Sequence, residues 1–338
     1  MRGGAWGTSL EPGLAAMGSP VRYRPPAVAG LFYPGDPAVL RATVEAQLRA
    51  ASRAARLARA ARTSPATRAA GAARTAPPGV EPPALPPKAL IAPHAGYAYS
   101  GPIAAGAFST LADAEPDAAA PRLPAVVADR PAGSAGLPVH PGVSRVVLLG
   151  PAHRVAIRGL GLPAEEGFAT PLGQVPLDLA AMAVLAAMPQ VAVRPDAHEE
   201  EHSLEVELPF LQVVLGRFTL VPLVVGTAGA DEVAEVLERV WGGPETLLVI
   251  SSDLSHYLTA EAAERADRET AAEILALGGP LRPDQACGAA PINGLLRAAR
   301  RRGMAARQLD LRHSGDTSGD RGRVVGYGAW AFDERAAA

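Results

Sequence analysis

The stretch LLVISSDLSH, residues 247–256, passes from a short apolar run directly into a polar loop that ends on a histidine. Four apolar residues bounded by polar ones are typical of a buried strand. The run ALIA at 89–92 is followed in the same way by His94. The run VVLL at 146–149 is followed by His153. Ligands of open α/β sheets bind outside the carboxyl ends of the strands, so the pattern predicts one shared site for these histidines.

The remaining apolar and amphipathic segments alternate along the chain. Two more short apolar runs, at 220–225 and 324–327, read as buried strands. Helical patterns lie between or beside the strands, at 177–188, 231–241, 261–277 and 292–302. This alternation predicts a three-layer α/β/α domain around a central mixed or mostly parallel sheet. Because it continues to the C-terminus without an internal repeat, we expect a single domain.

The composition narrows the classes of function. The chain has 338 residues, of which 48% are hydrophobic, so a sizeable core can be buried. A formal net charge of −2 offers no basic excess for a nucleic-acid partner. No apolar run approaches the roughly 20 residues needed to span a bilayer, so no membrane role is predicted. A single cysteine excludes an intrachain disulfide, and together with the lack of a secretory pattern it favours a cytoplasmic location.

Three segments look peripheral to the fold. Residues 1–20 carry no structural signal, so we expect them to be disordered or, if Met17 is the start, not translated. Ala/Pro/Arg-rich stretches near 50–87 and 112–142 lack apolar periodicity and read as partly disordered surface insertions. Arginines recur on one helix face at positions 49, 53, 56, 59 and 62. A solvated extension of a helix that starts near Asp36 is the favoured interpretation, and an anion-binding stripe is the alternative.

The lone cysteine, Cys287, opens the motif CGAAPIN just before an apolar-periodic helix. Pro291 suits the first turn of that helix. A thiol at a helix N-terminus feels the positive end of the dipole, which favours the metal-binding thiolate. The alternative is a small buried hydrophobe. With the histidines nearby, two imidazoles and one thiolate form a plausible metal set.

The stretch HEEEH at 198–202 matches the zinc-protease pattern H-E-x-x-H. From 196 to 203 the only apolar residue is Ala197, so such a helix could not bury itself, and no third ligand follows at a familiar spacing. We therefore predict that His198, Glu199 and Glu200 form an exposed acidic turn. His202 instead leads a separate motif, HSLE, that belongs to the site.

Six motifs occur in an order that identifies a family. They are AGLFYP (29–34), APHAGY (92–97), LGPAH (149–153), EHSLEVELP (201–209), SSDLSH (251–256) and CGAAPI (287–292). Together they resemble the Memo family, whose bacterial branch is called AmmeMemoRadiSam system protein B. The resemblance covers roughly residues 21–333 apart from the two insertions, and it implies a fold related to the class III extradiol dioxygenases, with one deep pocket.

The resemblance also implies a ligand set. His94 and His153 would bind the metal, and Cys287 would stand where the dioxygenases have a carboxylate. His202 and His256 would line the pocket as acid–base or oxygen-contacting groups. Asp253 would orient His256 or a ligand.

The function implied by the resemblance is metal-dependent. Iron(II) is the favoured metal, with copper or zinc as alternatives, because a thiolate is a softer ligand than a carboxylate. The leading hypothesis is oxygen-dependent oxidation of an unknown small molecule. The alternative is a non-catalytic binding module that docks a radical S-adenosylmethionine protein or an AMMECR-type protein. Ala29 stands where eukaryotic members carry a histidine, so peptide binding is not inferred.

Overall fold

The computed structural model describes residues 21–63, 86–112 and 142–334. The predictions for residues 1–20, including a start at Met17, lie outside these ranges. Most of the two predicted insertions also lies outside them. In the described part of the chain, no helix is long and apolar enough to cross a membrane.

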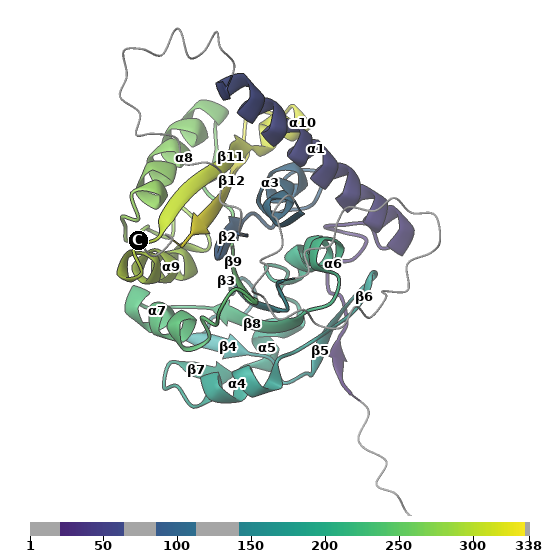
Figure 1. Ribbon diagram of the computed structural model, residues 1–338, viewed down its shortest axis with the longest axis vertical. Helices are drawn as coiled ribbons and strands as arrows, with labels where there is room; N and C mark the ends of the chain where they lie inside the picture. The colour runs from purple at the N-terminus through teal and green to yellow at the C-terminus, as the bar shows by residue number, and fades with distance from the viewer. Residues whose placement is uncertain (1–20, 64–85, 113–141, 335–338) are drawn as a thin grey trace, which may run out of the picture.

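A large mixed sheet forms the centre of the molecule (Figure 1). Its strands run in the order β10-β12-β2-β9-β3-β8-β4-β7, with β11 added beside β12. The bounds are β2 Ala89–Ala92, β3 Arg145–Pro151, β4 Leu160–Leu162, β7 Val191–Val193, β8 Thr219–Val225, β9 Thr246–Ser251, β10 His256–Leu258, β11 Ala305–His313 and β12 Val324–Asp333. The middle strands β2, β9, β3 and β8 are parallel, whereas β12 and β4 are antiparallel to their neighbours β2 and β8. All five predicted strands are confirmed, in a mixed sheet.

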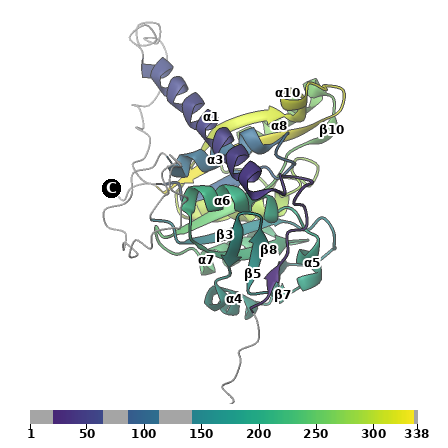
Figure 2. The same cartoon turned by 90° about the vertical axis from the view of Figure 1, so that its right-hand side faces the viewer.

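Helices cover both faces of the sheet and give the predicted three layers (Figures 1 and 2). One face carries α1 Pro37–Thr63, α3 Gly101–Ala112 and α6 Leu208–Leu215. The other carries α7 Ala230–Arg239, α8 Ala260–Leu275 and α9 Ala289–Arg301. Shorter elements are α4 Leu179–Ala186, α5 Pro195–Glu199, a 3-10 turn at Glu205–Glu207, and α10 Ser314–Ser318. The four predicted helices correspond to α4, α7, α8 and α9.

A small second sheet lies beside the main one. It consists of β1 Tyr23–Arg24, β5 Gly167–Thr170 and β6 Gly173–Pro176. Strand β1 pairs with β5 in parallel, so the start of the described chain is held against a segment about 140 residues further on. The N-terminal segment is thereby brought close to the loop that carries His202.

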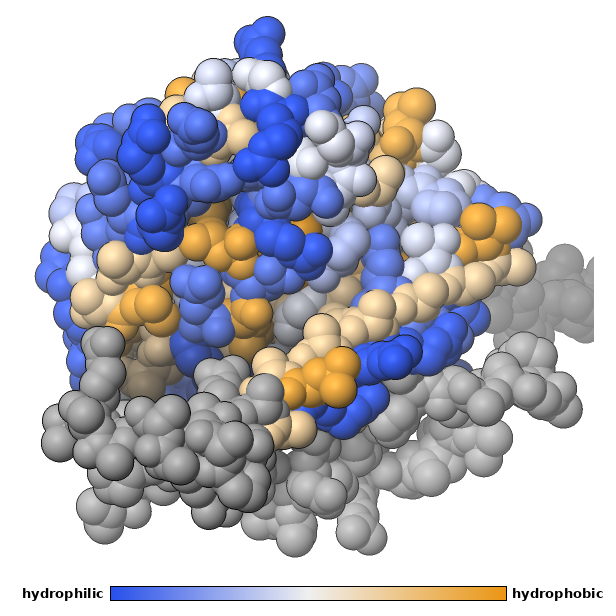
Figure 3. All heavy atoms as spheres, turned by 90° about the horizontal axis from the view of Figure 1, so that it is seen from above, coloured by the Kyte–Doolittle hydropathy of each residue, from blue (hydrophilic) through white to orange (hydrophobic). Residues whose placement is uncertain are grey.

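Helix α1 contains the first part of the first predicted insertion. Its N-terminus is capped by Asp36, whose Oδ1 accepts hydrogen bonds from the N–H groups of Ala38 and Val39, both at 2.9 Å. The helix continues to Thr63, so the first part of the insertion is helical. Beyond Ser52 the side chains that the structure describes on this helix are exposed, among them Arg53. Figure 3 views the molecule from above, where hydrophilic (blue) and weakly hydrophobic (pale orange) residues lie side by side along α1. This agrees with a solvated extension.

The register of the central strands positions the site. Strands β2 and β3 both pair with β9, one on each side, and all three run in the same direction. Ala92 lies opposite Ser251, and Leu149 lies opposite Ile250. The loops after the three strands therefore leave the sheet side by side at one edge.

Candidate metal centre

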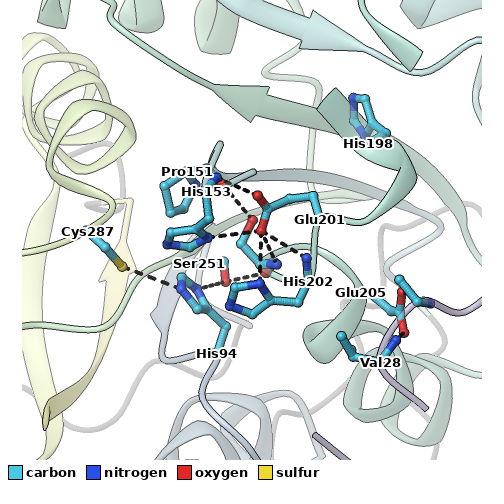
Figure 4. A network of polar contacts seen from close by, with 12 residues as sticks. Val28, His94, Pro151, His153, His198, Glu201, His202, Glu205, Ser251 and Cys287 are labelled. Atoms are coloured by element: carbon cyan, nitrogen blue, oxygen red, sulfur yellow. Dashed lines mark hydrogen bonds and ion pairs between the residues drawn. The ribbon is translucent and has the colours of Figure 1, made fainter. Parts of the chain in front are cut away.

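Three histidines meet at this edge of the sheet (Figure 4). His94 follows β2, His153 follows β3, and His202 belongs to the loop after α5. Each offers a ring nitrogen, and the three nitrogens lie within 4.8 Å of one another. The ring centroids are 5.2 Å apart for His94–His153, 5.4 Å for His94–His202 and 4.7 Å for His153–His202. This spacing suits ligands of a single metal ion.

The thiol of Cys287 adjoins this cluster. Its Sγ lies 3.4 Å from Nε2 of His94 and 3.3 Å from the backbone nitrogen of Asp253. The residue sits in the loop just before α9, as predicted. The predicted preference for thiolate is not found, because burial, together with the charge of Asp253, raises the pKa of Cys287 to about 12. A cation at the sulfur would be needed to favour the thiolate.

Two polar partners hold the buried His94 in place. Its backbone N–H donates to Oδ1 of Asp253 at 2.9 Å, and its Nδ1 lies 2.7 Å from Oγ of Ser251. With Nδ1 occupied, Nε2 is the atom left to face the sulfur of Cys287. Burial, reinforced by the nearby His153 and His202, holds the pKa of His94 well below its usual range. The ring is therefore neutral at pH 7, as a metal ligand must be.

Glu201 organises the other two histidines, and the sequence-based prediction missed it. Its carboxylate accepts hydrogen bonds from the backbone N–H groups of His153 (2.5 Å), His202 (2.9 Å) and Ser203 (2.9 Å). The His153 ring contacts it through Nδ1 at 3.0 Å. Nδ1 of His202 lies 3.2 Å away, outside hydrogen-bond geometry. Although burial opposes ionisation, the nearby imidazoles of His153 and His202 hold the pKa of Glu201 well below its usual range.

Such a carboxylate behind an imidazole is a common feature of metal sites, where it fixes ring orientation and raises ligand basicity. The signal in the sequence was weak, because Glu201 is one of three consecutive glutamates. Only Glu201 of the three is buried.

Asp253 and His256 take different positions relative to the cluster. Asp253 is buried and contacts His94 through the backbone hydrogen bond described above, so it supports a candidate ligand. Burial raises the pKa of Asp253 to about 7. His256 lies on β10, whose residues are all exposed at the rim. Partial desolvation and the nearby His153 lower the pKa of His256.

The match to H-E-x-x-H does not form a metal site. His198 lies in α5, and its Nε2 is 2.8 Å from the carbonyl oxygen of Gly161, so the ring points away from the cluster (Figure 4). Glu199 and Glu200 are exposed as predicted, but the prediction was wrong for His198, which is only 1% exposed. Helix α5 packs against β4, and that contact covers the imidazole.

The N-terminal segment forms one wall of the site. The ring of Phe32 lies 4.7 Å from that of His202. Glu205, fully buried, holds this segment through Arg24 (2.6 Å) and the hydroxyl of Tyr33 (2.6 Å). Arg24 also donates to the carbonyl oxygen of Glu201 at 2.6 Å. One network of ionic and hydrogen-bond contacts thus joins the N-terminal segment to the loop that carries His202.

The site is open on one side. The side chain of His153 is 30% exposed and that of His202 16%, whereas His94 is 1% exposed. A surface hollow of about 360 Å³ is lined by Phe32 and its neighbours in the N-terminal segment, and another of about 620 Å³ lies elsewhere; neither is lined by His94, His153 or Cys287. The candidate centre is therefore defined by converging side chains.

Comparisons with known proteins agree with the motifs. The sequence profile of the family described as Memo-like protein matches residues 24–120 and 132–331. A MEMO1 family protein of Methanosarcina acetivorans is 34% identical over 257 residues, covering 71% of this chain and 83% of that protein. One of Methanopyrus kandleri is 32% identical over 327 residues, covering 91% and 98%. One of Aeropyrum pernix is 36% identical over 263 residues, covering 71% and 82%.

A likeness among solved structures is more distant. The crystal structure of an uncharacterized protein from Escherichia coli K12 has a TM-score of 0.37 and 16% sequence identity, over 56% of this chain and 85% of that one.

Proposed function

This chain belongs to the Memo-like protein family, and we propose that it binds a redox-active metal ion through His94, His153 and Cys287, with His202 beside them. The observation that supports the proposal is the convergence of three imidazoles, within 4.8 Å of one another, beside a thiol. Nδ1 of His94 and Nδ1 of His153 already have partners, so each ring has one nitrogen to offer.

The donor set favours certain metals. Imidazole suits zinc, copper and iron, and a thiolate selects the softer ions among them. The neutral His94 ring needs no deprotonation, whereas Cys287 must lose its proton when a cation binds. We propose iron(II) as the favoured metal, with copper and zinc as competitors.

The proposed activity is oxygen-dependent oxidation of a small molecule. A bound redox metal would supply the site at which dioxygen and substrate meet. The exposed side of His153 provides the approach for that substrate. In this proposal His256 would accept a proton, since desolvation and His153 favour its neutral form.

Metal reconstitution tests the proposal. Protein without an affinity tag is loaded anaerobically with iron(II), copper(I) or zinc(II), and bound metal is measured by elemental analysis. We expect about one equivalent, and we expect His94→Ala to lower the affinity at least tenfold. Glu200→Gln, a change at an exposed residue next to Glu201, serves as the control and should bind metal like the wild type. A wild-type chain that stays metal-free with all three ions would refute the proposal.

Two variants separate the ligand sets. If Cys287 binds the metal, Cys287→Ala abolishes the thiolate-to-metal charge-transfer absorption of the iron or copper form. If three histidines bind it instead, His202→Ala is the more damaging change and the absorption of the wild type lacks that band. The spectra of the two variants therefore decide whether Cys287 or His202 binds the metal together with His94 and His153.

A further inference from the structure

The motif that carries His202 contains three buried glutamates in different surroundings. Glu201 and Glu205 are 2% and 0% exposed, and each is surrounded by hydrogen-bond donors. Glu205, for example, faces Arg24 and accepts from the N–H groups of Ala27 (2.7 Å) and Val28 (3.0 Å). Such surroundings stabilise a carboxylate.

Glu207 lies in the same motif without such donors. It is fully buried, and its Oε1 lies 2.8 Å from Oγ of Ser251. Its Oε2 has no hydrogen-bond partner within the described ranges of the chain. In the described part of the chain, Glu207 also forms no salt bridge. A carboxylate in these surroundings would be a buried charge without compensation, which is costly.

The hydrogen bonds of the Ser251 hydroxyl give a second, independent argument against an ionised Glu207. Its Oγ has three neighbours: the carbonyl oxygen of Ser203 at 2.6 Å, Oε1 of Glu207 at 2.8 Å, and Nδ1 of His94 at 2.7 Å. A hydroxyl has one proton to donate and two lone pairs to accept with. The carbonyl of Ser203 can only accept, so it takes that proton. The other two contacts are hydrogen bonds only if Glu207 and His94 are the donors.

We propose that Glu207 is a neutral carboxylic acid that donates its proton to Ser251 and is a positioning residue for His94. Ser251, held by Glu207 and Ser203, then presents a lone pair to Nδ1–H of His94. The imidazole is fixed in the tautomer whose Nε2 lone pair faces Cys287. The protonation state of Glu207 stands by itself, whereas its consequence for His94 rests on the proposed metal site.

The electrostatics agree with this assignment. Burial, with a further contribution from the charge of Asp253, raises the pKa of Glu207 well above its usual range. Glu201 shifts in the opposite direction. The pKa values of two glutamates six residues apart in one motif are therefore shifted in opposite directions.

Infrared difference spectroscopy tests the protonation state directly. Spectra of metal-free wild type and Glu207→Gln are recorded at neutral pH and subtracted. We expect the wild type to show one additional carbonyl band of a protonated carboxylic acid. Since Asp253 is another buried carboxyl group with a raised pKa, the subtraction is needed to isolate Glu207. Additional carboxylate bands in place of the acid band would overturn the proposal, whatever the metal results are.

Matched substitutions test the positioning role. Gln at 207 is neutral and can still donate to Ser251, so Glu207→Gln should keep wild-type metal affinity. Glu207→Leu removes the donor and should lower the affinity about tenfold or more. Glu201→Gln removes a charge that accepts several N–H groups and should be as damaging as Glu207→Leu. Equal losses for Glu207→Gln and Glu201→Gln would contradict the proposal, and this comparison does not depend on whether the leucine variant folds.

Discussion

Individual residues show that the neighbours supplied by the fold, more than residue type or burial alone, decide the role of a polar side chain in this protein. His94 and His198 are both 1% exposed, yet His94 belongs to the histidine cluster and His198 contacts a backbone carbonyl. The sequence predicted that His94 and His153 lie close together, and their ring centroids are 5.2 Å apart. It placed His198 at the surface, because its neighbours Glu199 and Glu200 are charged. The buried side of α5 was not visible in that stretch.

His198 should make stability depend on pH. Burial lowers its pKa to about 4, against an ordinary value of 6.5. Between these values the unfolded chain binds more protons than the folded one, so stability falls as the pH drops from 6.5 to 4. The loss amounts to about 3 kcal/mol in the free energy of unfolding. Urea denaturation across this pH range should show that His198→Gln removes this part of the dependence, whereas Glu200→Gln keeps it. An unchanged pH profile in His198→Gln would contradict the assignment.

Lys88 is the only lysine of the chain, and it has a structural role. Its buried Nζ donates to the carbonyl oxygens of Trp241 (2.6 Å), Gly243 (2.8 Å) and Thr246 (2.8 Å). The ammonium group has three donors, which matches this arrangement, while the planar guanidinium of arginine does not.

Replacing Lys88 with Met should destabilise the protein by about 3 kcal/mol, because three carbonyls lose a charged donor. Thermal or urea denaturation measures the change. Arg49→Met is the matched control, since Arg49 is exposed and its recorded ion pair is with Glu45 one turn away. The control should change stability by less than about 0.5 kcal/mol. Equal effects of the two substitutions would show that the buried contacts of Lys88 contribute nothing.

At the scale of elements, apolar runs and amphipathic patterns were reliable guides. The strands at 89–92 and 247–250 and the helix at 231–241 are found within one or two residues of their predicted bounds. Helix α3 was missed because it is buried on most sides and rich in alanine, so no polar face marks its period. Short strands such as β4 and β7 were missed because three residues carry no detectable alternation.

The N-terminal segment depends on the Arg24–Glu205 pair. Glu205→Gln leaves a buried guanidinium without a counter-charge and should cost about 3 kcal/mol or more. Hydrogen–deuterium exchange should show faster exchange at the amides of Ala27 and Val28, which bond to Glu205. The double variant Arg24→Met/Glu205→Gln removes both charges and should recover part of the stability. No change in exchange at these amides would rule out the role of the pair.

The whole molecule supplies the geometry that makes the site. The proposed ligand residues come from loops separated by up to 193 positions, as for Cys287 and His94. Adjacent parallel strands bring the loops after β2 and β3 together on either side of β9. The layer that contains α9 then places Cys287 beside them. A ligand set assembled in this way requires the complete sheet, so we expect isolated segments of the chain to bind metal poorly.

The sequence by itself determined the family, the three-layer α/β/α class, the main strands and the expected neighbourhood of His94 and His153. These follow from local patterns, since apolar runs and strand-end motifs are written in consecutive residues. The tertiary structure alone decided that His202, predicted only to line the pocket, offers a ring nitrogen within 4.8 Å of those of His94 and His153, that Glu201 holds His153, and that Glu207 is buried without a counter-charge. The physical reason is that orientation and protonation depend on neighbours distant in the chain. A buried carboxyl group is ionised or neutral according to the donors that the fold places around it.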